Sequence, residues 1–540
     1  MPVTGVDDHS GAEYDERRTE RRMTPNRRTF LRGGLATGAG AAAGALLGGG
    51  TALAGPASPA LVRRRPRLTH GVQSGDATAH EAVVWARSDR PARMLVEVSR
   101  RPDFARARRI PGPLLTPGTD LTGKAFLRGL PAGEEIHYRV VLADPDRRSV
   151  LSEPVTGRLR TAPRDRSDIR FVWSGDLAGQ GWGIDGALGG YRIFDAMGAL
   201  DPDFFLCSGD LVYADGPLQE TVRLPDGRTW RNLVTPEKSK VAETLAEYRG
   251  QFRYNLEDAA MRAFNARVPM VYQWDDHEVV NNWYPGEILD LPQYTEKRVD
   301  VLAARARRAM FEYTPTAVRP HRNGRLYRRV SYGPLLDVFV LDMRTHKDAN
   351  GANDSPTAAG GVLGAEQLGW LKRELRRSRA TWKVIAADLP IGLIVPDGSA
   401  QEGIAQGDGG APLGREREIA DLLSYAKRRG VRNMVWLTAD VHYTAAHYYD
   451  PAKAAFQDFD PFWEFVSGPL NAGAFGPNTL EGTFGPQLDF HRAPRTPNTS
   501  PAEGFQHFGE VDLDGGSGEL TVRLRDIDGA VLYTRTLAPR

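Results

Sequence analysis

This chain of 540 residues has almost no cysteine and no excess charge of either sign. Its one cysteine, Cys207, cannot form a disulfide bond within the chain. It ends an apolar segment with nothing nearby to lower its pKa, so we predict a core thiol rather than a nucleophile. The 70 Lys and Arg balance 68 Asp and Glu, and no basic stripe indicates nucleic-acid binding. The length allows more than one domain.

Long hydrophobic runs are also lacking, with one uncharged exception near the N-terminus. Residues 33–54 are mostly Ala, Gly and Leu, and they follow a segment that contains the pair Arg27-Arg28. Paired arginines before a weakly hydrophobic, glycine-rich stretch are typical of a twin-arginine signal peptide, which we place at residues 1–54. A membrane anchor is the alternative, but so many glycines would make a poor membrane helix. We therefore expect export by the twin-arginine machinery, action outside the cytoplasm and no stable membrane span.

Residues 66–162 contain short apolar runs separated by turn residues, for example 81–86, 94–98 and 136–141. Several short strands at this spacing predict a small β-sandwich. The pattern Leu-x-x-Leu-Pro-Ala-Gly…Tyr-x-Val resembles fibronectin type III-like modules. Residues 163–167 are typical of a linker, so we expect an N-terminal domain at 66–162 and a second domain at 168–540.

In the second domain, apolar strands alternate with helical patterns. This order favours an α/β fold with sheet layers flanked by helices. We expect strands at residues 169–175, 204–208, 268–274, 336–341, 382–387 and 433–438, and helices at residues 186–200, 295–313, 365–377 and 415–428. The helix at 295–313 is long and charged, which predicts an exposed helix. A glycine-rich turn at 515–518 predicts a hairpin near the C-terminus.

Acidic and imidazole side chains follow several of these strands. Asp176 and Asp210 each come after a Ser-Gly turn, where the small glycine lets the backbone approach an ion. Four titratable groups, 275–278, follow a buried strand, where their burial would be costly without a cation. Asp440 and His442 would share one face of an extended segment. Oxygen and nitrogen ligands without a thiolate favour hard or borderline ions, and metal pairs are common in phosphate-ester hydrolysis.

Individual roles follow from the chemistry of each side chain. Asp210 is the natural bridging ligand, because its two oxygens can serve one ion each. Tyr213 is within reach of the same metal, and a phenolate would favour a ferric ion; the alternative is an aromatic ring packed beside the site. His277 is a candidate proton donor, since imidazole titrates near neutral pH. Arg344 would hold a phosphate oxygen or, equally, pair with Asp342.

The combination Asp…Gly-Asp-x-x-Tyr…Asp-His-Glu…Asp-x-His resembles the calcineurin-like metallophosphoesterases, and its Gly-Asp-x-x-Tyr element is similar to purple acid phosphatases. The segments Gly71-Val72-Gln73-Ser74-Gly75-Asp76, Asp275-Asp276-His277-Glu278 and Leu341-Asp342-Met343-Arg344 resemble the alkaline phosphatase D family. The resemblance implies that residues 168–540 form a four-layer αββα sandwich with a metal cluster between its sheets.

Motif matching also implies a ligand set. A ferric ion would be held by Asp176, Asp210, Tyr213 and His442, and a divalent ion by Asp210, Asp276 and Asp440. Carboxylates stand at two positions of the second site where the superfamily has Asn and His, which favours Ca²⁺, with Mn²⁺ and Mg²⁺ as alternatives, over Zn²⁺. The sequence departs from the superfamily after Asp176, where the second His of Asp-x-His is missing. Asp275 and Asp388 are left open as ligands.

The function that these expectations imply is a secreted, monomeric hydrolase of phosphoric esters. A metal-bound hydroxide would attack phosphorus, and His277 would protonate the leaving oxygen. Monoesters and diesters both fit, and a phospholipase D-like action on phospholipids is the main alternative. A non-catalytic secreted binding protein is a further alternative, which the retained ligand residues disfavour.

Overall fold

The computed structural model describes residues 65–317, 324–357 and 361–540. The signal peptide predicted at residues 1–54 lies outside these ranges. No helix in the described part of the chain has the length and apolar character needed to cross a membrane.

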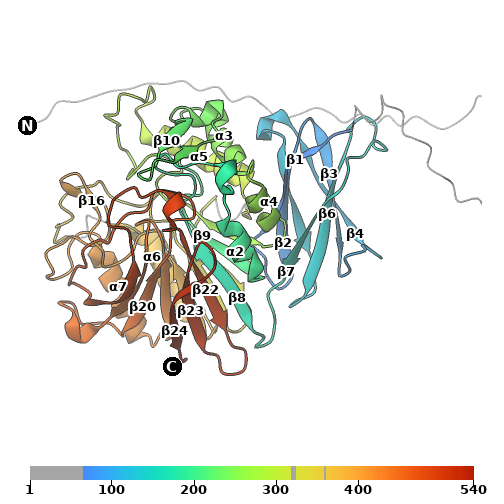
Figure 1. Cartoon of the computed structure of the whole chain (residues 1–540). Helices are drawn as coiled ribbons and strands as arrows, with labels where there is room; N and C mark the ends of the chain where they lie inside the picture. The colour runs from blue at the N-terminus through green and yellow to red at the C-terminus, as the bar shows by residue number, and fades with distance from the viewer. Residues whose placement is uncertain (1–64, 318–323, 358–360) are drawn as a thin grey trace, which may run out of the picture. The chain divides into compact units, whose positions relative to one another are not determined.

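The largest sheet has nine strands and joins segments from both ends of the chain (Figure 1). In order these strands are β24 (Val531–Leu537), β23 (Leu520–Asp526), β22 (His507–Leu513), β8 (Ile169–Ser174), β9 (Phe204–Ser208), β12 (Met270–Gln273), β1 (Leu68–Gly75), β2 (Glu81–Ser88) and β5 (Thr122–Arg128). Strands β8, β9 and β12 run parallel. Their carboxyl ends therefore meet at one edge of the sheet.

A second sheet has seven strands. In order they are β13 (Arg328–Tyr332), β14 (Leu336–Val340), β15 (Trp382–Ala386), β18 (Met434–Thr438), β20 (Phe462–Val466), β19 (Thr444–Tyr449) and β21 (Pro486–Arg492). Strands β14, β15, β18 and β20 are parallel. Two-stranded ribbons lie in loops, formed by β10 (Thr221–Arg223) with β11 (Thr229–Arg231) and by β16 (Pro396–Asp397) with β17 (Ala400–Gln401).

Three apolar clusters hold the two sheets and their helices together. One lies between the sheets and joins residues such as Phe171, Phe204 and Val384. A second packs the other face of the nine-stranded sheet against α2 (Ile193–Ala199), α3 (Leu245–Asn255), α4 (Ala259–Asn265) and α5 (Val299–Tyr313). A third packs the other face of the seven-stranded sheet against α6 (Gly364–Arg377) and α7 (Glu416–Arg428). The predicted sheet-rich α/β fold is thus confirmed, whereas its four-layer description stays a prediction.

The N-terminal segment forms two β-layers, one of which is part of the nine-stranded sheet. Its own four-stranded sheet consists of β4 (Arg108–Leu115), β3 (Ala92–Ser99), β6 (Glu135–Ala143) and β7 (Val155–Arg160). An apolar cluster joins this sheet to β1, β2 and β5. Strand β1 in turn pairs with β12 through Gly75 and Met270. The N-terminal β-structure is present, but its fibronectin type III-like character stays a prediction.

Two predicted helices differ from the observed ones. The segment 186–200 is broken, because Gly189 and Gly190 both adopt positive φ angles (93° and 59°) before α2 begins. The helix predicted as exposed, 295–313, begins at Val299 and buries one face, including Leu302 and Met310. Its charges lie on the other face, so the density of charged residues concealed an amphipathic helix. The predicted C-terminal hairpin is confirmed as β22 and β23.

Candidate metal centre

The candidate site lies where the carboxyl ends of parallel strands from both large sheets meet. Asp176, Asp210 and Asp275 follow β8, β9 and β12 of the nine-stranded sheet, and Asp388 and Asp440 follow β15 and β18 of the other sheet. All five side chains are at least 88% buried. Parallel strands end at the same edge of a sheet, so the residues that follow them lie at this edge. Residues far apart in the sequence therefore converge there.

The turns after these strands have unusual backbone conformations. Asp176, Asp210, Asp440 and His442 all have positive φ angles, of 67°, 48°, 68° and 59°. Such angles are uncommon outside glycine and cluster at functional sites. The prediction that Asp440 and His442 share one face of an extended segment is therefore wrong, because both sit in a turn between β18 and β19. The turn nevertheless brings both side chains to the site.

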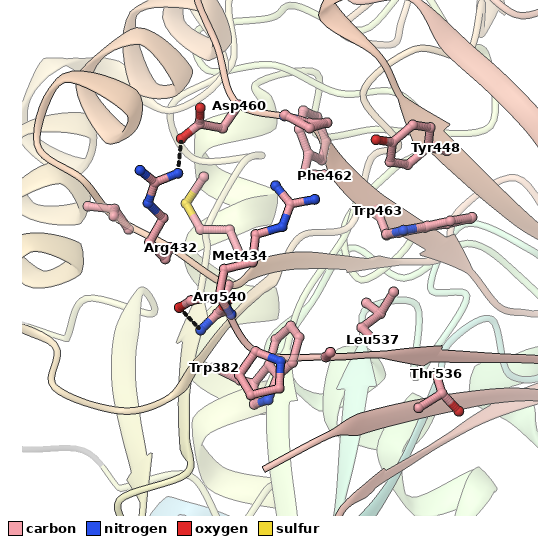
Figure 2. A pocket seen from close by; sticks show the side chains of 15 residues that line it. Trp382, Arg432, Met434, Tyr448, Asp460, Phe462, Trp463, Thr536, Leu537 and Arg540 are labelled. Carbon is pink, nitrogen blue, oxygen red and sulfur yellow. Dashed lines mark hydrogen bonds and ion pairs between the residues drawn. The ribbon is translucent and has the colours of Figure 1, made fainter. Parts of the chain in front are cut away.

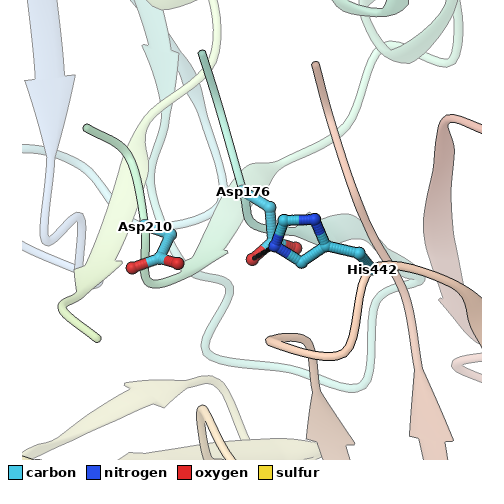
Figure 3. Close-up of side chains that lie close together, drawn as sticks. All are labelled: Asp176, Asp210 and His442. Carbon is cyan, nitrogen blue, oxygen red and sulfur yellow. Dashed lines mark ion pairs between the residues drawn. The ribbon is translucent and has the colours of Figure 1, made fainter. Parts of the chain in front are cut away.

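Asp176, Asp210 and His442 form the first of three candidate ligand groups (Figure 3). Each offers a ligand atom within 4.8 Å of the others. His442 Nε2 lies 3.5 Å from Asp176 Oδ1. Neither carboxylate oxygen of Asp176 accepts a hydrogen bond, although both are buried. A buried carboxylate without a donor is costly, so this group fits a cation.

His442 is held in the tautomer that a metal ligand needs. Its Nδ1 lies 2.5 Å from the carbonyl oxygen of Gly473, to which it donates a proton. Its Nε2 is therefore the atom that faces the site, 2.7 Å from the hydroxyl of Tyr213. Burial, more than any other influence, lowers the pKa of His442 to about 4. A neutral imidazole whose other nitrogen is fixed by a carbonyl is typical of metal ligands.

Shared residues link the other two ligand groups to the first, one after the other. Asp210, Asp276 and His277 form one, and Asp275, Asp276 and Asp440 form the other. Asp210 thus belongs to two groups and Asp276 to two, so the three groups form a continuous chain. This arrangement brings together every predicted acidic and imidazole ligand. Asp275 joins a group as well, whereas Asp388 joins none in the described part of the chain.

The concentration of carboxylates changes their proton affinities. Burial, followed by the charges of neighbouring carboxylates, raises the pKa values of Asp176, Asp210 and Asp440 well above the usual range. Asp276 differs: burial alone would raise its pKa, but His277 and Arg344 outweigh burial and lower it to about 2. Positive charge at this place would ionise the whole cluster, which is what bound metal ions provide.

His277 is paired with a residue that the sequence analysis missed. Its Nδ1 lies 2.8 and 2.9 Å from the two carboxylate oxygens of Asp215. Although burial alone would lower the pKa of His277, Asp215 and Asp276 outweigh it and raise that pKa to about 9. The His277 ring also lies 4.1 Å from the ring of Tyr213, centroid to centroid. Asp215 stands in a glycine- and proline-rich loop, where no strand pattern marked it.

Arg344 lies beneath the carboxylates and is fully buried. Its guanidinium contacts Asp275 and Glu402 closely, and it lies 3.2 Å from Asp440 and 3.4 Å from Asp388. The predicted alternative, a pair with Asp342, is wrong: that carboxylate accepts from Trp274 Nε1 at 2.9 Å. Arg344 therefore compensates several acidic groups at once.

Glu278 joins the loops that carry the ligands. Its carboxylate accepts hydrogen bonds from the backbone amides of Asp210 (3.2 Å), Leu211 (2.8 Å) and Asp275 (2.8 Å), and from the hydroxyl of Tyr272 (2.6 Å). With both oxygens so engaged, it is a scaffold residue. The sequence predicts that a cation compensates the charge of Glu278; its donors in the structure are backbone amides and a hydroxyl, and burial still raises its pKa to about 7.

Two glycines keep the ligand loops close together. A side chain at Gly209, which has φ +102°, would come within 2.5 Å of the Asp275 Cβ. One at Gly468 would come within 2.3 Å of Asp176 Oδ2. Both positions therefore require a residue without a Cβ atom.

A sheet-rich α/β fold with linked groups of buried carboxylates and imidazoles at its strand ends defines the metallophosphoesterase-like class. Comparison with known proteins identifies the family within that class. Residues 171–524 match the PhoD-like phosphatase family, and residues 54–163 match the N-terminal domain of PhoD-like phosphatases. The chain belongs to the PhoD-like phosphatase family, which confirms the resemblance seen in its motifs.

Individual relatives agree with this assignment. Alkaline phosphatase D of Bacillus subtilis (strain 168) is 31% identical over 303 residues, which are 53% of this chain and 49% of that protein. The chain thus matches about half the length of this relative. The solved structure of PhoD superposes with a TM-score of 0.64 at 21% identity, covering 87% of this chain and 89% of that one.

A more distant fold match is purple acid phosphatase PPD1 from yellow lupin (Lupinus luteus) seeds. It has a TM-score of 0.55 at 14% identity and covers 88% of this chain and 74% of that one. At these identities the two structural matches establish the fold alone.

Proposed function

We propose that this protein is a metal-dependent hydrolase of phosphoric esters. The observation that carries the proposal is the chain of three ligand groups linked by Asp210 and Asp276. Membership of the PhoD-like phosphatase family supports it, as does the likeness to an alkaline phosphatase D. The four-layer αββα sandwich and the fibronectin type III-like module belong to the same proposal.

The residues fit two metal ions. Asp176, Asp210, Tyr213 and His442 would hold the first, and Asp210, Asp276 and Asp440 the second. Tyr213 favours Fe³⁺ at the first position, and the all-carboxylate second set favours Ca²⁺, with Mn²⁺ or Mg²⁺ as alternatives. When bound, such ions neutralise phosphoryl oxygens and make water a stronger nucleophile.

His277 would act as the general acid. Asp215 accepts the proton on Nδ1, so Nε2 is the ring atom left to carry a proton toward the site. The Asp215 carboxylate also accepts a hydrogen bond from the backbone N–H of Asn281 at 2.7 Å, which fixes the carboxylate independently of His277. Arg344 favours the ionised forms of Asp275 and Asp440, although burial still raises the pKa of both carboxyls. Its prediction as a phosphate contact stays open.

The first experiment is metal analysis of purified protein combined with assays on p-nitrophenyl phosphate and bis-p-nitrophenyl phosphate. Asp210→Asn should lose turnover and lower the content of both metals, because both ions need its charge. Asp203→Asn, at the other end of β9, is the matched buried control and should keep both. Normal metal content and turnover in Asp210→Asn would contradict the bridging role.

The two substrates also separate the remaining alternatives. Faster hydrolysis of the monoester indicates a phosphatase, and faster hydrolysis of the diester indicates a phosphodiesterase, including the phospholipase D-like alternative if phospholipids are cleaved. A metal-loaded protein that hydrolyses neither would support a binding protein instead.

The iron assignment has its own spectroscopic test. A ferric phenolate absorbs visible light, so iron-loaded protein should be violet to brown, and Tyr213→Phe should lose the colour while remaining folded. Iron-loaded wild-type protein without a visible band would remove Tyr213 from the ligands.

We also propose that the protein is exported by the twin-arginine pathway and that it is a monomer. Replacing Arg27 and Arg28 with Lys should block export while activity in a lysate is retained. Continued secretion would indicate a general export signal instead.

A further inference from the structure

Arginines gather in a cavity at the end of the seven-stranded sheet that lies away from the ligand groups. The cavity has a volume of about 560 Å³. Its lining includes Arg166, Arg376, Lys383, Arg429, Arg432 and Arg540. No Asp or Glu lines it among the described residues.

The position of the cavity separates it from the metal centre. Residues before β15 and β18 line it, whereas Asp388 and Asp440 follow the same two strands at their carboxyl ends. Each strand has five residues, and at about 3.3 Å per residue its ends are roughly 13 Å apart. A ligand in this cavity is therefore not a substrate in contact with the ligand groups.

Three of the arginines have no ion pair in the described part of the structure. Arg376 lies in the last turn of α6 and is exposed. Arg429 follows α7 and lies over the ring of Tyr425, 5.8 Å from its centroid. Arg166 donates from Nε to the Gly515 carbonyl oxygen at 3.2 Å. A carbonyl oxygen and an aromatic ring carry no net negative charge, so Arg166 and Arg429 keep their full positive charge, as does the exposed Arg376.

The other cations contribute less. Arg432 is 3.2 Å from Asp460, a pair that Figure 2 shows in the adjoining cavity. Lys383 is buried and donates to the Ala380 carbonyl oxygen at 2.6 Å. Arg540, like Arg432, also lines the adjoining cavity. The net charge of the cavity therefore rests on Arg166, Arg376 and Arg429.

The helix ends explain only part of this arrangement. Helix C-termini favour cations, because their carbonyl oxygens carry partial negative charge, which accounts for Arg376 and Arg429 one at a time. It does not account for Arg166, which comes from the linker before β8. Three unpaired guanidinium groups around one hollow repel one another, and an anion with several charged oxygens would relieve that repulsion.

We propose that this cavity binds a soluble polyanion that carries several phosphate-like groups. Guanidinium groups bind phosphate and sulfate oxygens through paired N–H donors. The three arginines come from α6, from the residue after α7 and from the linker before β8, an arrangement that suits several anionic groups rather than one. An adjoining cavity of about 370 Å³ shares Arg432 and Arg540 and has Trp463 and Tyr448 in its wall (Figure 2). It offers room for the remainder of such a molecule.

Sucrose octasulfate is a suitable probe, because it is a compact polyanion that a phosphoesterase cannot hydrolyse. Calorimetric titration of wild-type protein should show one bound equivalent. The double variant Arg376→Gln/Arg429→Gln should weaken binding at least tenfold. The double variant Arg148→Gln/Arg373→Gln removes the same charge from exposed positions outside the cavity, and it should bind within twofold of wild type.

Turnover of p-nitrophenyl phosphate should be the same in all three proteins, since no variant touches the metal centre. Unchanged binding in the first double variant, or equal losses in both, would overturn the proposal. The proposal would also be overturned if Arg376→Gln/Arg429→Gln lost binding to anionic phosphatidylglycerol vesicles but not to the soluble probe. The partner would then be a membrane surface. The binding measurements do not depend on whether the protein is a phosphoesterase.

Discussion

At the scale of single residues, the site depends on side chains that hold others in place. Asp215 fixes the tautomer of His277, the Gly473 carbonyl fixes that of His442, and Glu278 fixes the backbone of the ligand loops. Such supporting contacts orient metal ligands and proton donors. Their loss should therefore change catalysis without removing any group that contacts substrate.

Asp215→Asn is expected to impair proton donation by His277. The amide keeps a hydrogen bond but loses the charge that favours a protonated imidazole, so turnover of an alkyl phosphate should fall roughly 10²-fold. Turnover of p-nitrophenyl phosphate should fall much less, because p-nitrophenolate leaves without a proton. Steady-state kinetics on both substrates, with metal analysis, measures the difference.

The control for this experiment is Asp226→Asn, an exposed carboxylate in the neighbouring β10–β11 ribbon that pairs with Arg228. It should leave both substrates unaffected. Equal losses on the two substrates in Asp215→Asn, together with lost metal, would show that the His277–Asp215 pair supports metal binding instead.

At the scale of elements, the turn after each strand decides whether its carboxylate reaches the site. The turns after β8, β9 and β18 all place an Asp at positive φ. The turn after β9 is also tightly packed, since Gly209 lies against Asp275.

Gly209→Ala should destabilise the protein by more than backbone strain alone. The positive φ costs about 1 kcal/mol for a residue with a Cβ, and the close approach to Asp275 adds to it. Gly181→Ala is the matched control, because Gly181 has φ +93° with no atom within 4 Å of the added Cβ. Urea unfolding should show a larger loss of unfolding free energy for Gly209→Ala, with lower metal content. Equal losses would mean that the β9 turn can shift freely.

At the scale of the whole molecule, the N-terminal β-structure and the remainder of the described chain are joined by buried polar contacts. Arg328 on β13 and Asp76 after β1 form an ion pair at 2.8 Å, with side chains only 2% and 9% exposed. Trp85 Nε1 donates to the Glu312 carbonyl oxygen at 2.8 Å. The two parts should therefore unfold together.

Asp76→Asn should lower the free energy of unfolding by about 3 kcal/mol, because it leaves Arg328 buried without a counter-charge. Asp103→Asn breaks an exposed pair with Arg101, so its effect on the free energy of unfolding should be much smaller. Denaturant unfolding at neutral pH compares them. A loss at Asp76 no larger than that at Asp103 would show that the two parts are not energetically joined.

The stability of the molecule should also fall in acid through His507 on β22. Burial, then the charge of Arg492, lowers the pKa of His507 to about 3. Between the ordinary imidazole pKa of about 6.5 and pH 3, the unfolded chain binds a proton that the folded chain does not. This contribution is fully present above pH 6.5 and is lost as pH falls, by about 2 kcal/mol at pH 5.

His507→Gln should flatten the dependence of unfolding free energy on pH between 6.5 and 5, relative to wild type at the same metal concentration. His491→Gln, on exposed β21, should keep the wild-type slope. If the unfolding free energy of His507→Gln kept the wild-type dependence on pH, the pKa of His507 would not be lowered in the folded protein.

The sequence by itself determined the sheet-rich α/β class and most of the central strands, and it singled out the acidic and imidazole residues that gather in the candidate site. These follow from local patterns: an apolar run of five or six residues predicts a buried strand, and a carboxylate directly after it lies at the edge of the sheet. The same patterns supported the family resemblance. They failed for helix 295–313, where charge concealed a buried face.

Only the tertiary structure decided how these residues pair. Nothing local to Asp215 or Glu402 links them to His277 or Arg344, because these contacts join loops that are 62 and 58 positions apart. Likewise, the groups that contact Asp440 and His442 come from other segments: Arg344 lies 3.2 Å from Asp440, and the Gly473 carbonyl oxygen accepts from His442 Nδ1. Local sequence fixes which groups stand at strand ends, whereas the packing of the two sheets fixes which of them meet.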